Sequence, residues 1–181
     1  MQVTDVVETI VETYPDAVLV SSLGTATSAV LKVSDDGPHF YHGAAMGSAV
    51  PSALGLAEAV PDKQIVAVVG DGDLLMGMSS LWSLSAYPVS NLIVVVLEDG
   101  AYSITGGQSL SVPLHVADVA NTLDHLSGGT AVDQAELRTA LKTIGQPGII
   151  SAQISKKVWP GPSPFVNPAR VSWRVRDALR K

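Results

Sequence analysis

The sequence predicts an α/β domain of three layers, in which a mostly parallel central sheet is covered by helices on both faces. Short, continuous apolar runs alternate along the chain with segments of helical periodicity, and 46% of the residues are hydrophobic. Continuous apolar runs are typical of strands buried on both faces, and their alternation with helices is typical of parallel βαβ units. Because 181 residues is a usual size for one domain, we expect residues 1–181 to fold as a single domain.

The first helix is predicted from apolar residues at i, i+3, i+4 and i+7 spacing between residues 3 and 14, and Pro15 ends it. The apolar run AVLVS (17–21) predicts the first strand. The segment SSLGTATS (21–28) follows this strand and can cap the next helix.

The remaining elements are three buried strands and four helices, predicted from the same two patterns. The strands are expected at 65–69, 92–97 and 148–154. The helices are expected at 47–59, 74–86, 116–123 and 133–143. Asp133 and Glu136 form a capping-box pattern at the start of the last helix. The helix at 47–59 is apolar almost all round, which fits either an assembly face or ordinary core packing.

Composition excludes several kinds of chemistry. The chain has no cysteine, which rules out disulfides, thiolate zinc sites and iron–sulfur clusters ligated by this chain. Its longest apolar runs, 65–69 and 92–97, are far shorter than the ~20 residues that span a bilayer. The N-terminal segment lacks the basic end and apolar core of a signal peptide. We therefore expect a cytoplasmic protein with no membrane partner.

Charge is distributed unevenly. Residues 1–155 carry 16 acidic and 4 basic side chains, a net charge of −12, whereas residues 156–181 carry 7 basic and 1 acidic, a net charge of +6. This charge disfavours nucleic acid as a partner of the main body, and we expect none. The basic C-terminal tail, 156–181, is expected to contain a helix that is either solvated or docks a partner or an anionic group.

Two acidic loops follow neighbouring strands of the predicted sheet. Gly70-Asp71-Gly72 comes directly after the strand at 65–69, and Asp99 follows the strand at 92–97. Parallel neighbours would deliver both carboxylates to one edge of the sheet, where they can ligate magnesium or calcium. Gly70 and Gly72 let the backbone approach a phosphate closely. The tripeptide alone is also an ordinary tight turn.

The spacing of these loops resembles the spacing of the corresponding motifs in the thiamine-diphosphate-dependent enzymes. Asp71 and Asp99 are 28 positions apart, and the segment GAAMGSAVPSALGLA (43–57) places Met46 24 residues before Gly70. The resemblance implies the thiamine-diphosphate-binding fold and a metal held by Asp71, Asp99 and the carbonyl of Ala101. It also implies that Met46 holds the cofactor bent, and that the carbonyl of Ala44 accepts from its amino group. The full set of implied cofactor-binding positions is Gly24, Thr25, Ala44, Met46, Gly70, Gly72, Asp73, Leu74 and Tyr102.

One departure from that family lies in the second loop, where Glu98-Asp99 replaces the usual pair of asparagines. Asp99 remains a good metal ligand, and an added carboxylate should favour metal binding. Glu98 is expected either to form a hydrogen bond behind the ligand or to be an exposed acid.

Within the family, the sequence looks most similar to sulfopyruvate and phosphonopyruvate decarboxylases. The string ITGGQ (104–108) and the proline- and arginine-containing end of the chain (162–181) carry this resemblance. The chain has room for only one of the family's two cofactor-binding domains. The resemblance therefore implies a beta-type subunit of a 2-oxo acid decarboxylase. A pyrimidine-binding alpha-type subunit would supply the activating glutamate. The alternatives are a subunit of an acetolactate-synthase-like carboligase and a non-catalytic regulatory subunit.

Several polar and aromatic residues have no assigned role in that scheme. His42 and His115 are candidate catalytic residues, although structural hydrogen bonding is the commoner role of histidine. Residues 1–155 contain only four cationic side chains, so either the partner binds a second anionic group of the substrate or the substrate is a different 2-oxo acid. The three tryptophans, Trp82, Trp159 and Trp173, are expected in the core or in subunit contacts.

Overall fold

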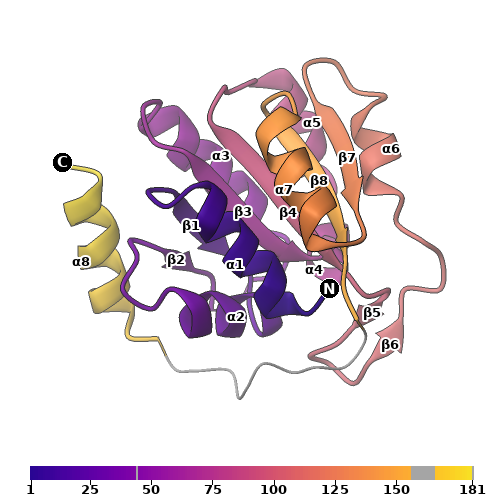
Figure 1. Ribbon diagram of the computed structural model, residues 1–181, viewed down its shortest axis with the longest axis horizontal. Helices are drawn as coiled ribbons and strands as arrows, with labels where there is room; N and C mark the ends of the chain where they lie inside the picture. Colours follow the sequence, from indigo (N-terminus) through magenta and orange to yellow (C-terminus); the bar gives the residue numbers. More distant parts are fainter. Residues whose placement is uncertain (44, 156–165, 181) are drawn as a thin grey trace.

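A computed structural model describes residues 1–43, 45–155 and 166–180 (Figure 1). Its centre is a six-stranded sheet with the order β2-β1-β3-β4-β8-β7, in which every neighbouring pair is parallel. The predicted α/β class is confirmed. The strands of this sheet are β1 (Val18–Ser21), β2 (Phe40–Tyr41), β3 (Ile65–Gly70), β4 (Leu92–Glu98), β7 (Ser127–Ala131) and β8 (Gly148–Gln153).

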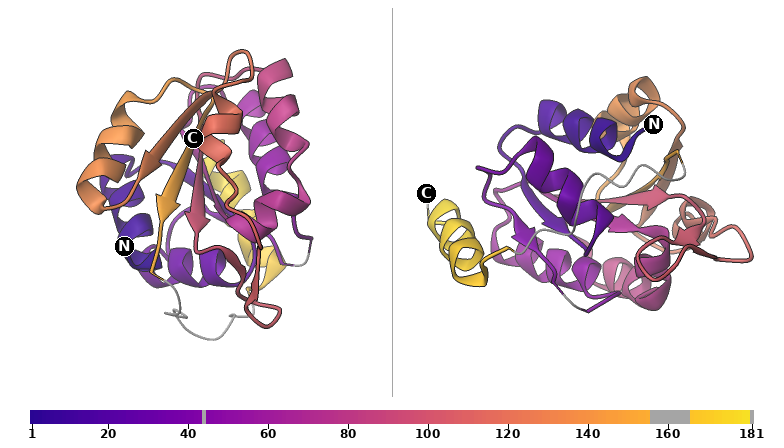
Figure 2. Two further views of the ribbon diagram at one scale, coloured as in Figure 1. Left: turned by 90° about the vertical axis from the view of Figure 1, so that its right-hand side faces the viewer. Right: turned by 90° about the horizontal axis from the view of Figure 1, so that it is seen from below.

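Helices cover both faces of the sheet, as the left-hand view of Figure 2 shows. One layer consists of α1 (Val3–Thr13), α2 (Thr25–Val33) and α7 (Gln134–Thr143). The opposite layer consists of α3 (Ala49–Ala59), α4 (Asp71–Met76), α5 (Ser80–Ala86) and α6 (Val116–Ala120). A last helix, α8 (Pro168–Ala178), contacts the edge strand β2. None of the described helices is long and apolar enough to cross a membrane.

The apolar runs form the middle of the sheet because each strand buries both of its faces. Ile65, Ala67 and Val69 of β3 pack toward α3 and α5, whereas Val66 and Val68 pack toward α1 and α2. Burying one such side chain completely stabilises the fold by about 1.5–3 kcal/mol. Two separate apolar cores therefore hold the central strands in place.

The sequence missed both edge strands of the sheet. β2 contains only two residues, and β7 has the sequence Ser-Gly-Gly-Thr-Ala, which is half-buried rather than apolar. The amide and carbonyl of Gly128 pair with the side chain of Asn121, which helps to fix β7 beside α6. β7 is thus a strand because of its position in the sheet rather than its hydrophobicity, and β2 is too short to form a recognisable run.

Two of the predicted helices were wrong in extent. The single helix expected at 74–86 is two helices, because α4 begins at Asp71 and ends before Gly77, where the backbone packs directly against that of Gly47. The helix expected at 116–123 ends at Ala120. The predicted cap of α7 is confirmed, since Asp133 Oδ1 accepts from the amide of Glu136 at 2.9 Å.

A small antiparallel hairpin leaves the sheet after β4. It consists of β5 (Ala101–Tyr102) and β6 (Gln108–Ser109). The register of the sheet places Gly70 of β3 beside Leu97 of β4, so both strands end at the same level. The loops that contain Asp71 and Asp99 therefore emerge together, next to this hairpin.

Candidate cofactor and metal site

Asp71 lies at the centre of this edge of the sheet. Only 1% of the residue is exposed. Its Oδ1 accepts from the amide of Gly72 at 2.7 Å, and its Oδ2 accepts from the amides of Gly100 at 2.7 Å and Asp99 at 3.1 Å. The Asp71 carboxylate therefore joins the two loops that the sequence predicted to meet.

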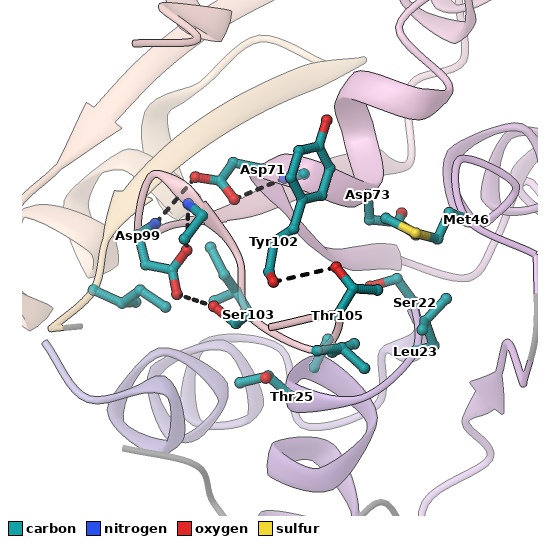
Figure 3. Close-up of a pocket in the computed structure, with 17 residues that line it drawn as sticks. Ser22, Leu23, Thr25, Met46, Asp71, Asp73, Asp99, Tyr102, Ser103 and Thr105 are labelled. Carbon is teal, nitrogen blue, oxygen red and sulfur yellow. Dashed lines mark hydrogen bonds between the residues drawn. The ribbon is translucent and has the colours of Figure 1, made fainter. Parts of the chain in front are cut away.

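Asp99 lies beside Asp71 with both of its carboxylate oxygens hydrogen-bonded. Oδ1 accepts from the amide of Ala101 at 3.0 Å, and Oδ2 accepts from the hydroxyl of Ser103 at 2.5 Å (Figure 3). These bonds hold the carboxylate in a fixed orientation within the loop that leads into β5.

Two carboxylates at this position are electrostatically unfavourable unless a cation is bound. Burial raises the pKa of Asp71, and the charge of Asp99 raises it further, while the three backbone amides oppose both effects. A divalent ion would offset this repulsion. Carboxylate and carbonyl oxygens, such as those predicted from Asp71, Asp99 and Ala101, are the hard donors that magnesium and calcium prefer. In the part of the chain that the structure describes, no three His, Cys, Asp or Glu side chains gather to bind a metal, so further ligands would come from water or phosphate.

A cavity of about 80 Å³ opens beside the two aspartates (Figure 3). Of the implied metal and cofactor residues, those that line it are Thr25, Met46, Gly70, Asp71, Gly72, Asp73, Asp99, Ala101 and Tyr102. Two others do not line it. Gly24 is at the start of α2, next to the cavity, and the side chain of Leu74 is buried in the core between α4 and the sheet. Ala44 is outside the described residues.

Two glycines are required by the close packing around the cavity. A Cβ atom at Gly72 would lie 2.7 Å from the ring of Tyr102. Gly24 has a φ of +64°, and a Cβ atom there would lie 2.1 Å from the Cδ1 atom of Ile104. Real Cβ atoms do not approach other atoms so closely, so any side chain at either position would displace the wall of the cavity.

Asp73 supports the segment that contains Met46. Its carboxylate is buried, and Oδ1 accepts from the amide of Gly47 at 3.2 Å. Burial raises the pKa of Asp73, and the bond from Gly47 opposes this. Asp73 therefore fixes the loop before α3 against α4, which places Met46 in the cavity wall.

Sequence reasoning missed part of the cavity wall. Ser22 and Leu23 follow β1, and Ile154 follows β8, so both segments are at the same carboxyl edge as Asp71. The rule that identified Asp71 and Asp99 could have found them. The remaining wall residues were not assigned a role from sequence: Ala26, Leu97, Ser103, Ile104 and Thr105.

Glu98 follows the first of its two expected alternatives. It is half-buried, and its carboxylate accepts a short hydrogen bond from the hydroxyl of Ser151 in β8. The acid therefore binds the neighbouring strand behind Asp99, instead of projecting into solvent.

Neither candidate histidine lines the cavity. His42 Nδ1 is 3.1 Å from the hydroxyl of Ser48, and burial lowers the pKa of this histidine. His115 is exposed at the start of α6, with Nδ1 3.9 Å from a carboxylate oxygen of Asp118. The structure thus gives both side chains neighbours outside the cavity, and a catalytic role for either stays a prediction.

The structure is an α/β domain with a cavity at the carboxyl edge of its parallel sheet, which is where ligands bind in open α/β folds. A family model described as "Thiamine pyrophosphate enzyme, C-terminal TPP binding domain" matches residues 23–152. The chain belongs to this thiamine pyrophosphate enzyme family. The matched range includes every described metal and cofactor position named above.

Individual relatives agree with this assignment. Phosphonopyruvate decarboxylase of Streptomyces viridochromogenes is 35% identical over 167 residues, which cover 89% of this chain and 42% of that protein. Sulfopyruvate decarboxylase subunit beta of Methanococcus maripaludis is 25% identical over 183 residues, covering 98% and 97%. The chain thus spans less than half the length of the phosphonopyruvate decarboxylases it matches.

The same fold occurs in a solved structure. The thiamine diphosphate-dependent 4-hydroxybenzoylformate decarboxylase of Rhodococcus jostii superposes with a TM-score of 0.69 at 17% identity. The match covers 87% of this chain and 33% of the other. At this level of identity the likeness concerns the fold alone.

Proposed function

We propose that the chain is the beta-type subunit of a two-subunit thiamine-diphosphate-dependent decarboxylase that acts on a small 2-oxo acid. The observation that carries the proposal is the joining of the Asp71 and Asp99 loops at the carboxyl edge of the sheet. The relatives named as phosphonopyruvate decarboxylase and sulfopyruvate decarboxylase subunit beta support the reaction class.

Each described residue then has a role in binding or orientation. Asp71, Asp99 and the carbonyl of Ala101 would hold magnesium or calcium, which would bind the diphosphate of the cofactor. When bound, thiamine diphosphate supplies a thiazolium ring that accepts the electrons released on decarboxylation. Met46 would support the rings of the cofactor, while Asp73 keeps the Met46 loop in place.

A partner chain is part of this proposal, and one surface supports it. Leu75 and Met76 of α4, Trp82 of α5 and the following Tyr87 are all exposed, the last three by more than half. The sequence from residue 74 to residue 97 contains no charged side chain. Exposed, uncharged apolar surfaces of this kind mark protein interfaces. We propose that a pyrimidine-binding alpha-type subunit covers this surface and supplies the activating glutamate.

The test is a decarboxylation assay on the two-chain complex with magnesium and thiamine diphosphate. Sulfopyruvate, phosphonopyruvate and pyruvate are offered in turn, with and without an added aldehyde. We expect release of carbon dioxide from one of them. Asp71→Ala should lower the rate of this decarboxylation by at least about 100-fold. Carbon–carbon bond formation with the aldehyde would instead indicate a carboligase. Cofactor binding without turnover of any 2-oxo acid would indicate a regulatory subunit.

A further inference from the structure

The outer wall of the cavity is a short stretch of the hairpin after β4. We call Ser103, Ile104 and Thr105 the covering segment, because all three line the cavity. The Ile104 side chain occupies the space above Gly24, at the start of α2. Behind the covering segment the chain turns through Gly106 and Gly107, both with positive φ, to return along β6.

The covering segment has few attachments to the rest of the chain. Thr105 and Gln108 bond to each other, at 3.1 Å between Oγ1 and Oε1 and at 3.0 Å between Nε2 and the Thr105 carbonyl, and these bonds stay inside the hairpin. Ser103 differs, because its hydroxyl donates to Asp99 Oδ2 at 2.5 Å. A hydrogen bond to an ionised carboxylate is about twice as strong as one between neutral groups.

This bond also determines the orientation of Asp99. One carboxylate oxygen accepts from the Ala101 amide, and the other accepts from Ser103. A carboxylate with two such donors keeps free lone pairs for a metal but loses its rotational freedom. Ser103 therefore pre-orients the proposed metal ligand.

The cavity must open for a diphosphate to enter. Its volume of about 80 Å³ is well below the roughly 300 Å³ of a typical ligand pocket. Its other walls are strand ends and the starts of α2 and α4, which are tied into the sheet, together with Tyr102 of β5 and Met46, whose loop Asp73 holds against α4. Outward movement of the covering segment is the change that this arrangement allows with least disruption.

We infer that Ser103 is a positioning residue that couples metal binding at Asp99 to closure of the covering segment over the diphosphate. The inference rests on the proposed role of Asp99 as a metal ligand. Metal and closed segment require the same orientation of the Asp99 carboxylate, so each favours the other. Loss of the Ser103 hydroxyl should weaken metal binding and release the covering segment together.

Hydrogen exchange and calorimetry on the two-chain complex test this coupling. Ser103→Ala removes the hydroxyl, Ser103→Thr restores it, and Ser109→Ala removes an exposed hydroxyl in the same hairpin as a control. We expect Ser103→Ala to bind magnesium about tenfold more weakly in the presence of thiamine diphosphate. The amides of residues 103–107 should exchange faster without metal and lose most of the protection that metal gives. Ser103→Thr and Ser109→Ala should resemble the unmodified protein.

The outcomes separate this inference from the proposed function. If the unmodified complex binds magnesium and cofactor and Ser103→Ala matches it in affinity and exchange, the coupling is wrong and the function stands. Failure of Ser103→Thr to restore either property would also overturn the coupling. If the unmodified complex binds neither magnesium nor cofactor, both proposals fail.

Discussion

The two helical layers bury similar apolar cores but present very different surfaces to solvent. The layer of α1, α2 and α7 exposes five charged side chains: Glu8, Glu12, Lys32, Glu136 and Lys142. It also carries an ion pair between Glu12 and Arg138, with 2.6 Å between oxygen and nitrogen. In the opposite layer, the exposed positions of α3, α4, α5 and α6 include two charged residues, Glu58 and Asp118.

This difference indicates which helical layer has a surface suited to contact with solvent. Folding alone explains the inner faces of both layers, because each packs against the sheet. It does not explain why Met76, Trp82 and Tyr87 are exposed on one layer only. Since α4 also contributes Asp71 to the cavity, a chain that covered this sparsely charged layer would adjoin the proposed cofactor site. The asymmetry is thus what the proposed two-chain enzyme requires.

The first prediction tests whether the two helical layers contribute equally to the stability of the fold. Leu84 in α5 and Leu141 in α7 are both buried. Replacing either with alanine removes buried methyl groups and leaves a cavity, so each should lower the free energy of unfolding by about 2–5 kcal/mol. Urea denaturation of the two variants measures this. A negligible cost at Leu84 alone would break the comparison, because the sparsely charged layer would then be loosely packed and its exposed residues would need no partner.

The second prediction tests whether the layers differ in assembly. Trp82→Glu places a charge on the sparsely charged layer and should weaken association with the alpha-type subunit by at least about 100-fold, since an unpaired buried charge is unfavourable. Lys142→Glu makes a charge change on the opposite layer and should leave association unchanged. Sedimentation velocity on the mixed chains measures both. Equal effects of the two substitutions would contradict the assignment of the interface.

The third prediction concerns pH and the charged side of the molecule. His39 is buried; its Nδ1 accepts from the amide of Leu19, and Nε2 is 3.0 Å from the hydroxyl of Ser34. Burial, with a smaller effect of the Arg174 charge, lowers the pKa of His39 from 6.5 to about 4. A histidine whose pKa is lowered in the folded state takes up a proton on unfolding below its unfolded pKa. The contribution of neutral His39 to the free energy of unfolding is therefore complete above pH 6.5 and is lost as pH falls toward 4.

Denaturation at two pH values measures this effect. The free energy of unfolding should fall by about 2 kcal/mol between pH 7 and pH 5 through His39. His39→Gln keeps hydrogen-bonding groups but removes the titration, so that part of the pH dependence should disappear. An unchanged pH dependence in the variant would show that His39 is not its source.

Much of the fold could be predicted from the sequence because the central strands consist of unbroken apolar runs. β3 and β4 were predictable for this reason, and the parallel order then placed Asp71 and Asp99 at one edge. The cofactor was implied by the family resemblance that the spacing of Met46 to Gly70 helps to carry. The break at Gly77 was not predictable, because it depends on backbone contact with Gly47, 30 positions away.

The least predictable features are those made by side chains across short turns or outside the core. The Ser103 hydroxyl reaches Asp99 only because the hairpin folds back at β5. For Trp82, sequence alone left open whether it belongs to the core or to a subunit contact. The structure places it on the surface, 56% exposed, so it is not in the core of this chain. Trp159, for which the same question was open, is outside the described residues.

The central claim is that this chain anchors the metal and the diphosphate through Asp71 and Asp99. Titration calorimetry of the two-chain complex with magnesium and thiamine diphosphate tests it most directly. Glu8→Ala on the charged layer serves as the matched control. The account predicts that Asp71→Ala and Asp99→Ala each weaken binding by at least about 100-fold, while Glu8→Ala binds like the unmodified protein. Binding by both aspartate variants with unchanged affinity would contradict the claim.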